Sequence, residues 1–311
     1  MDPTTEFVDQ IAQSYPDNPF LTSEYCQVRK NLGQVPVAFT IHENDRSVTA
    51  CIGFLSRGRL NTRLEIVSLP KLEDKELFWS SLFKECSRLS VTSLDVNTFA
   101  SVSADFPDSP AALTRHSRVE FSIDLRTPDL WANLNRRHRR MVNRAREAGL
   151  ELKEPSGSAA IEAHVDLANI SLSRLRKKGD NIDSEISIRE IELFQEFGAG
   201  TLYQVFRDAD LMGTLFVVKS TSGAYAQSSG SSDQGRELGA SHFLFFETAR
   251  RLQAEEKNVF NIGGVGDRRS GLSEFKQGFG ARATELEAAE YYLGGLLRRL
   301  LTKSKGLLWR S

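Results

Sequence analysis

The sequence is poor in cysteine and has no long apolar run. Its three cysteines, Cys26, Cys51 and Cys86, are widely spaced and form no CxxC pair, which argues against a disulfide framework and a structural zinc site. The first residues, MDPTTEFVDQ, contain neither the basic nor the apolar segment of a signal peptide. No run approaches the roughly 18 apolar residues of a membrane-spanning helix. We therefore expect a cytoplasmic protein with buried, reduced cysteines.

An excess of either charge is lacking too, as are the common catalytic motifs. The formal net charge is -1, which argues against a protein that binds nucleic acid over its whole surface. There is no G-x-S-x-G, no pair of histidines at metal-binding spacing and no Cys/His pairing, so a hydrolase or metalloenzyme is not expected. We expect no metal site. The 311 residues, 40% hydrophobic and 26% charged, favour two globular domains.

The predicted elements follow a similar order in both halves of the chain. In the first half we expect a helix over 20–32, strands over 36–42, 48–55 and 64–69, a helix over 74–89, and strands over 93–96 and 119–125. In the second half we expect a short strand over 150–153, helices over 161–177 and 187–197, strands over 200–207, 211–219 and 223–229, a loop over 230–239, a helix over 240–256, and strands over 259–262 and 284–293. This is an α+β order, without βαβ alternation. We expect an N-terminal domain over 1–126 and a C-terminal domain over 127–295.

An arginine-rich helix is predicted between the halves, over residues 127–149. Arg136, Arg140 and Arg144 recur at every fourth position, so they form one cationic ridge. Like charges at this spacing destabilise an isolated helix, and Asp129 and Glu147 are the only acidic residues on it. The ridge either pairs with carboxylates of the other domain or faces phosphate. We interpret it as phosphate-facing.

The stretch NVFNIGGVGDRRSGLSEFKQGFG, residues 258–280, has the features of a ligand site. A short apolar strand ends in a glycine turn with Gly263 and Gly264, where backbone can approach a ligand closely. Arg268 and Arg269 follow, and could hold phosphates bidentately. A short helix over 272–279 comes next and carries a lysine.

A second glycine-bearing loop precedes the helix over 240–256. It contains Arg236 and Gly239 in an R-x-x-G-x-S pattern. A loop that ends a strand and opens a helix directs backbone N–H groups and the helix dipole at one point, which suits a pyrophosphate. Strand, glycine loop, helix, strand and second loop form the core of the GNAT acyltransferase fold, in which two central strands splay and the acyl donor enters.

The run from Arg236 through Gly239 to FNIGGV and GLSEFKQGFGA resembles the Fem family of FemA-, FemB- and FemX-type peptidyltransferases, which are tandem GNAT-like proteins. The segment WANLNRRHRRMVNRAREAGLELKE is similar to the one that opens the second domain in that family. The resemblance covers roughly residues 128–293. It implies tandem GNAT-like domains with mixed central sheets flanked by helices. It also implies that the protein forms an amide by transferring an aminoacyl group from aminoacyl-tRNA to an amine, such as that of a peptidoglycan precursor, another peptide or a small molecule.

The resemblance also implies roles for single residues. Lys276 would stabilise the oxyanion, because the matching family position carries a lysine near the donor. Apart from the resemblance, the chemistry of the residues themselves makes Glu274, Asp267 and Asp233 candidates for the general base. His242 is expected on the inward face of an apolar helix as a core histidine, and His164 has no partner pattern. No tightly bound cofactor is implied, and the co-substrate is aminoacyl-tRNA.

Three other readings of the sequence stay open. The chain lacks the coiled-coil arm with which some members hold tRNA, so an acyl-CoA-dependent GNAT N-acyltransferase is one alternative. A non-catalytic GNAT-like module that binds a precursor or RNA through the arginine helix is another. The basic amphipathic end, LLRRLLTKSKGLLWRS over 296–311, either packs back on the protein, as we expect, or lies on an anionic membrane.

Overall fold

The two halves of the chain repeat one order of elements in the computed structural model, which describes residues 5–43, 46–59, 61–101, 106–109, 112–177, 185–265 and 271–294. The first half comprises α1 (Thr5–Ser14), a 3-10 turn (Pro19–Leu21), α2 (Ser23–Asn31), β1 (Val35–Glu43), β2 (Arg46–Arg57), β3 (Thr62–Ile66), α3 (Lys75–Arg88), β4 (Ser93–Val96) and β5 (Ala112–Asp124). The second comprises α4 (Leu130–Asn133), α5 (Arg136–Glu147), β6 (Glu151–Lys153), α6 (Ser158–Lys177), α7 (Ile188–Glu196), β7 (Gly200–Arg207), β8 (Asp210–Lys219), β9 (Gly223–Ser231), α8 (Asp233–Leu238), α9 (Ala240–Ala254), β10 (Val259–Val265), α10 (Gly271–Gln277) and β11 (Arg282–Tyr292). Arg268, Arg269 and residues 296–311 lie outside the described residues.

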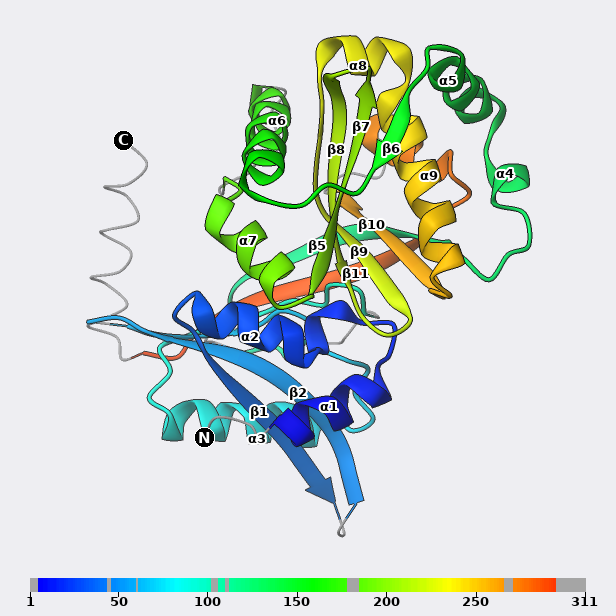
Figure 1. Cartoon of the computed structure of the whole chain (residues 1–311). Coiled ribbons are helices and arrows are strands. Elements are labelled where there is room, and N and C mark those ends of the chain that lie inside the picture. The colour runs from blue at the N-terminus through cyan, green and yellow to red at the C-terminus, as the bar shows by residue number, and fades with distance from the viewer. Residues whose placement is uncertain are drawn as a thin grey trace.

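All the strands named above belong to one mixed sheet. Over the described residues its order is β1-β2-β3-β4-β11-β5-β10-β9-β8-β7-β6, and helices flank it on both sides (Figure 1). Most neighbours are antiparallel, whereas β3 and β4, and β9 and β10, are parallel. Both parallel pairs are joined through a helix, as parallel strands require. The expected α+β class is confirmed.

The last strand of each half lies beside the other half. β11 pairs with β4 of the first half, from Ala289 opposite Val96 to Tyr292 opposite Ser93. β5 in turn pairs with β10 of the second half, and β5 and β11 pair with each other along most of their length. Each half therefore completes its sheet with a strand from the other. The division into 1–126 and 127–295 stays a prediction.

The two parallel pairs differ in how long their strands stay together. β9 and β10 pair only from Gly223 opposite Val259 to Tyr225 opposite Asn261, and no further pairing joins their described residues. In the first half, β3 and β4 pair along the whole of β4. Beyond them, a bridge between Ser68 and Thr98 joins the two segments that follow these strands. Among the described residues, the parallel pair of the second half therefore opens after Tyr225 and Asn261, and beyond this point β9 and β10 no longer pair with each other.

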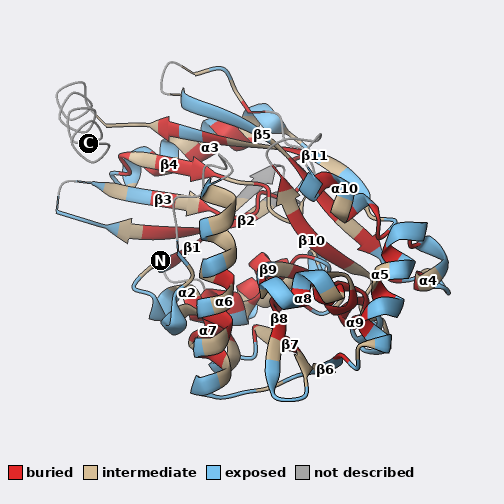
Figure 2. Ribbon diagram, turned by 90° about the horizontal axis from the view of Figure 1, so that it is seen from above, coloured by how far each residue is buried: buried red, intermediate tan, exposed pale blue. Residues whose placement is uncertain are grey.

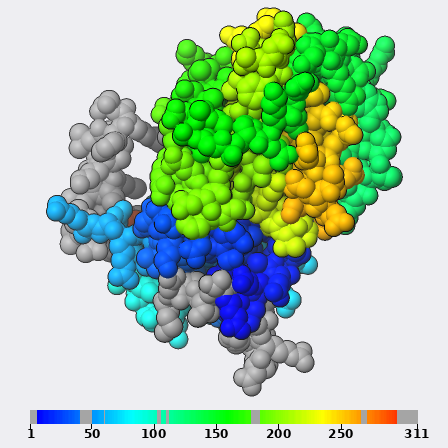
Figure 3. Space-filling view, in the orientation of Figure 1, coloured from blue at the N-terminus to red at the C-terminus, as the bar shows by residue number. Residues whose placement is uncertain are grey.

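Three hydrophobic clusters hold the layers together. One lies between the second half of the sheet and α5 and α9, a second between the opposite face and α2, α6 and α7, and a third between α3 and the first half of the sheet. Figure 1 shows α6 and α7 on one side of β7 and β8 and α9 on the other. Buried residues concentrate on strands and inward helix faces, whereas the outer side of α5 is exposed (Figure 2). The two halves meet along a continuous boundary (Figure 3).

Capping residues divide two helices that the sequence predicts as continuous. The helix expected over 127–149 is α4 and α5, because Leu134 is extended and the Asn135 side chain accepts a hydrogen bond from His138 N at 2.8 Å. Asp129 caps α4 through the backbone N–H groups of Trp131 and Ala132. The helix expected over 20–32 is likewise a 3-10 turn and α2, because Thr22 is extended and caps α2 through Tyr25 N. A side chain that satisfies a free N–H starts a new helix.

Two glycine segments also differ from the prediction. The loop expected over 230–239 contains α8, since β9 continues to Ser231 and Ser232 caps the helix through Gly235 N at 2.9 Å. The turn expected at Gly263 and Gly264 lies inside β10, which continues to Val265 through a shift in its pairing with β5. The segment of α1 has no counterpart among the predicted elements.

Candidate active site

A cavity of about 760 Å³ lies at the opening between β9 and β10. Its second-half walls come from β9, β10, α6, α8, α9 and α10, and its first-half walls from α2, β3 and neighbouring loops. Of the residues singled out in the sequence, it brings together Gly263, Gly264, Lys276 and Arg236. Both halves of the chain are therefore needed to form it.

Lys276 is the buried cation of this cavity. Its side chain extends from α10, its exposed fraction is 7%, and its Nζ donates a hydrogen bond to the backbone carbonyl of Ile262. Burial lowers the pKa of Lys276 to about 8, and the carboxylate of Glu120 opposes this shift. An amine with such a pKa can stabilise negative charge and exchange a proton near neutral pH.

A bulge in β10 makes room for this amine. The pairing of β10 with β5 shifts between Asn261 and Gly264, and Gly263 has a φ of +81°, which glycine adopts without strain. The side chain of Asn261 stabilises the bulge by accepting a hydrogen bond from Gly263 N at 2.8 Å. A Cβ on Gly263 would lie 3.2 Å from Lys276 Nζ. Glycine here therefore serves both the backbone turn and the position of the lysine.

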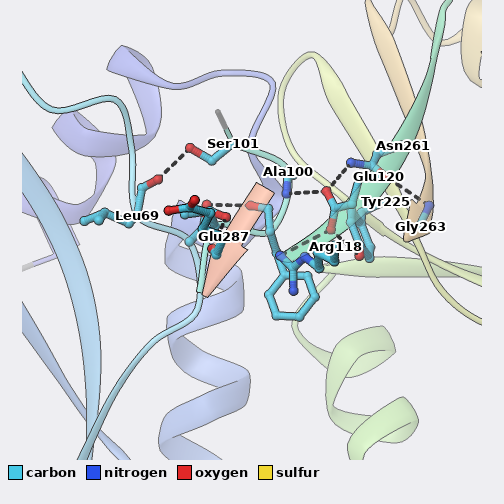
Figure 4. A network of polar contacts seen from close by, with 12 residues as sticks. Leu69, Ala100, Ser101, Arg118, Glu120, Tyr225, Asn261, Gly263 and Glu287 are labelled. Carbon is cyan, nitrogen blue, oxygen red and sulfur yellow. Dashed lines mark hydrogen bonds and ion pairs between the residues drawn. The ribbon is translucent and has the colours of Figure 1, made fainter. Parts of the chain in front are cut away.

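A buried carboxylate, Glu120 of β5, connects the strands at the start of the opening (Figure 4). It is 2% exposed and accepts hydrogen bonds from Tyr225 Oη at 3.0 Å, Asn261 Nδ2 at 2.8 Å and Ala100 N at 3.0 Å. Tyr225 and Asn261 are the last paired residues of β9 and β10. The network thus holds the point at which these strands separate.

Arg118 supplies the counter-charge to Glu120. Its Nη2 lies 3.4 Å from Glu120 Oε1 (Figure 4), and its guanidinium carbon lies 3.5 Å from the ring centre of Phe99. Desolvation lowers the pKa of Arg118 from its ordinary value. The sequence interpretation missed Arg118, Glu120 and Tyr225. The available signal was a single glutamate, Glu120, between the apolar residues Val119 and Phe121 of a predicted strand, because a buried charge requires a partner.

The other candidate residues lie elsewhere. Arg236 borders the cavity but is exposed and pairs with Asp233. Gly239 is outside the cavity lining; its φ is +84°, and a Cβ there would lie 2.6 Å from the backbone oxygen of Met141. Close packing of α5 against the α8–α9 junction therefore explains Gly239. Glu274 is exposed and outside the lining as well, since two positions along α10 separate it from the lysine.

The arginine ridge lies on the exposed face of α5, outside the cavity lining. Arg136, Arg140 and Arg144 border a second pocket on that face. Among the described residues, no ion pair joins any of the three to a carboxylate, whereas Arg146 pairs with Glu247 at 2.9 Å. Ligand binding by the ridge stays a prediction.

His242 and His138 are packed in an aromatic cluster beside the cavity. Their ring centres are 4.6 Å apart, and Phe275 and Phe279 complete the cluster. Burial, and then the neighbouring His138, lowers the pKa of His242 to about 4. The expectation of a core histidine agrees with this environment.

Clusters of possible metal ligands and membrane-spanning helices are both absent from the described ranges. No group of three or more histidines, cysteines and carboxylates there could hold a metal ion. None of the helices described combines the length and apolarity needed to cross a bilayer.

The chain shares its fold with several solved structures, although no protein-family model matches it and no curated protein is significantly similar. FemX is 14% identical, with 96% of this chain and 98% of that chain covered and a TM-score of 0.71. The C-terminal domain of a putative lysylphosphatidylglycerol synthetase from Agrobacterium fabrum is 14% identical over 97% and 96% of the chains, with a TM-score of 0.57. A tandem GNAT protein from the clavulanic acid biosynthesis pathway, solved without acetyl-CoA, is 14% identical over 84% of each chain, with a TM-score of 0.53. The expected tandem GNAT-like fold, of the kind seen in FemX, is confirmed.

Proposed function

We propose that the protein is an acyltransferase of the Fem and GNAT kind, which forms an amide bond at the opening between β9 and β10. The observation that carries this proposal is the buried Lys276, held at the β10 bulge in a cavity that both halves line. A buried amine facing unpaired strand edges suits a reaction in which negative charge develops on a carbonyl oxygen. The fold shared with FemX and with the tandem GNAT protein supports the same class of reaction.

The chemistry balances with the groups present. A neutral amine of the acceptor attacks the carbonyl carbon of an ester or thioester; the C–N bond forms and the bond to the leaving oxygen or sulfur breaks. The Lys276 ammonium stabilises the tetrahedral oxyanion. Because the pKa of Lys276 is about 8, its ammonium gives a proton to the leaving group more readily than an ordinary lysine does. The proton lost by the attacking amine restores the ammonium.

The proposed donor is an aminoacyl-tRNA. Arg136, Arg140 and Arg144 support it, since an exposed ridge of three arginines without carboxylate partners in the described residues is a suitable contact for RNA phosphates. The proposed acceptor is an amine-bearing peptide, such as a peptidoglycan precursor, or a small molecule. It would enter past the first-half wall, where Arg29 and Glu65 line the cavity. No tightly bound cofactor is proposed, and membrane contact through 296–311 stays a prediction.

An acyl-CoA donor is the second candidate. The unpaired edge of β9 beyond Tyr225 could pair with the amide groups of an extended ligand, and Arg236 borders the same cavity. The likeness to a tandem GNAT protein supports this candidate as well.

The test is a comparison of the two donor classes. Purified protein and a mixture of amine acceptors are incubated in two separate reactions. One contains a pool of labelled aminoacyl-tRNAs, and the other contains acetyl-CoA and a thiol reagent. Enzyme-dependent loss of label from one tRNA class identifies the donor and its amino acid, and ribonuclease treatment abolishes it. Release of CoA thiol, insensitive to ribonuclease, supports the second candidate.

Two variants of α10 decide whether the site is catalytic. Lys276→Met is expected to lower turnover by about a hundredfold or more, the usual effect of removing an oxyanion-stabilising group. Gln277→Ala changes an exposed neighbour on the same helix and is expected to keep turnover. Equal turnover in both variants would contradict the assignment of Lys276. Donor binding without turnover of any acceptor would favour the non-catalytic binding module.

A further inference from the structure

A buried histidine of α6 connects hydroxyl groups on two neighbouring strands. His164 Nδ1 lies 2.8 Å from Thr214 Oγ1 of β8, and His164 Nε2 lies 2.8 Å from Ser228 Oγ of β9. Both His164 and Thr214 are 0% exposed. Among the described residues, neither hydroxyl has another side-chain hydrogen bond. The three side chains therefore form a short linear chain, with Ser228 at one end.

The end at Ser228 reaches the cavity of the candidate active site. The pairing of β8 with β9 shifts between Phe216 and Val217, which lie opposite Ser228 and Ala226. Gln227 is therefore an extra residue, and such a bulge redirects the side chains beside it. Ser228 is half-buried and lines the same cavity as Lys276.

The number of protons that His164, Thr214 and Ser228 share indicates which of these side chains has a free donor. Burial lowers the pKa of His164 to about 4, so its ring is neutral at neutral pH and carries one N–H. If that proton were on Nδ1, it would point at Thr214 Oγ1, and the buried Thr214 hydroxyl would have no acceptor. An unsatisfied buried donor costs about 1–3 kcal/mol. The opposite tautomer satisfies every buried group: Thr214 donates to Nδ1, and Nε2–H donates to Ser228 Oγ.

In that arrangement the Ser228 oxygen accepts a hydrogen bond from His164, and its own proton is free to point into the cavity. We propose that Ser228 is a ligand-binding residue whose hydroxyl donates a hydrogen bond to the carbonyl oxygen of the acyl donor, and that His164 and Thr214 are positioning residues that keep this proton free. A carbonyl oxygen is an acceptor only, so a fixed donor discriminates in its favour. The inference rests on the proposed function, because that function supplies an acyl donor to this cavity.

The first test measures the tautomer of His164 without any ligand. Long-range ¹H–¹⁵N NMR of the full chain, with the His164 signals assigned by their loss in His164→Gln, is expected to show a protonated Nε2 and an unprotonated Nδ1. A protonated Nδ1 would overturn the proposal, because Ser228 would then donate to the histidine.

The second test asks whether Ser228 recognises a carbonyl. The probes are stable ketone analogues of an acyl donor, in an adenosine series and a CoA series, and matched analogues with a methylene in place of the carbonyl. Wild-type protein is expected to bind the ketone about tenfold more tightly than the methylene analogue in one series, as one net hydrogen bond implies. Ser228→Ala is expected to lose most of that preference.

Variants of the positioning residues separate recognition from structure. Thr214→Val removes the donor to Nδ1, so Ser228 can donate to the histidine and the preference is expected to fall, whereas Thr214→Ser should retain it. Thr221→Ala, an exposed position in the turn before β9, is the control. Thermal unfolding of each variant shows whether it is folded at the assay temperature.

The outcomes distinguish the two proposals. A folded Ser228→Ala protein with the wild-type preference would overturn the role of Ser228 and leave the proposed function intact. Failure of wild-type protein to bind any analogue in either series would contradict the proposed function, and with it this inference.

Discussion

Lys276 donates its hydrogen bond to the backbone carbonyl of Ile262, at the bulge where β10 departs from regular pairing with β5. The carbonyl at this irregularity of β10 is therefore bound by a side chain from α10. This hydrogen bond also places a buried amine beside Gly263, at the point where β9 and β10 have already separated.

The buried charge of Lys276 should lower stability in a pH-dependent way. Its pKa is about 8 in the folded protein against an ordinary 10.5, so below pH 8 the unfolded state binds the proton more tightly. Relative to wild type, Lys276→Met is expected to gain up to roughly 3 kcal/mol at pH 7. This advantage should shrink between pH 8 and 10.5, as the lysine loses its proton in the unfolded state also. Urea unfolding of both proteins across this range measures the difference, and a constant difference would contradict a lowered pKa.

His242 should make the protein less stable in acid. Burial, with His138 beside it, lowers the pKa of His242 to about 4 from 6.5, so its contribution is fully present above pH 6.5 and is lost as the pH falls toward 4. His242→Leu is expected to reduce the loss of unfolding free energy between pH 7 and 4.5 by up to about 3 kcal/mol. His116→Gln, at an exposed position, is the control and should follow wild type.

Gly239 should be required for close packing as well as for its backbone conformation. In Gly239→Ala the new Cβ meets Met141 O at 2.6 Å, whereas Gly198, also at positive φ, has no atom within 4 Å of such a Cβ. Gly198→Ala is therefore expected to cost about 1 kcal/mol, and Gly239→Ala at least about 1 kcal/mol more. Equal losses in chemical denaturation would show that α5 moves away without cost.

Asn261 should couple the fold to the active site. Asn261→Ala removes the acceptor of Gly263 N and a donor to Glu120, so about 2–4 kcal/mol of stability is expected to be lost. Turnover should also fall, because the bulge that positions the lysine is no longer held. Asn258→Ala, at the start of the same segment, removes one weak 3.4 Å contact and should do neither.

The arginine ridge should contribute to tRNA affinity through phosphate contacts. The triple variant Arg136→Ala, Arg140→Ala and Arg144→Ala is expected to weaken binding and to reduce the slope of log affinity against log salt by up to about three. A control triple variant, Arg88→Ala, Arg189→Ala and Arg250→Ala, removes the same charge from exposed sites on other helices. An unchanged slope in the ridge variant would contradict phosphate contacts and favour a structural role for the ridge.

Much of the fold was predictable because its elements are locally encoded. Alternating and periodic apolar residues predict most strands and long helices within a few positions, as for α3 and β7. The errors arise where a capping side chain competes with a continuing helix, as at Asn135, or where a strand continues through a glycine bulge, as at Gly263. Neither pattern can be distinguished from its alternative by periodicity alone.

The candidate site was predictable only in part. Lys276 and Gly263 stand close in a single glycine-rich stretch, so a local pattern draws attention to both. Glu120 lies 141 positions from Asn261, and His164 lies 64 from Ser228. A contact between such distant residues cannot be predicted from either segment, because each residue by itself is only a polar side chain in an apolar element.

The sequence alone determined the type and order of most elements, the repeat of that order in two halves, and the lysine-bearing stretch, since all three depend on neighbours a few residues apart. Only the tertiary structure decided that β5 and β11 each pair with a strand of the other half, that β9 and β10 separate after Tyr225 and Asn261, and that Ser228 of the cavity wall is hydrogen-bonded to His164. These features depend on strand pairing and on buried hydrogen bonds between distant segments, which form only when the whole chain packs.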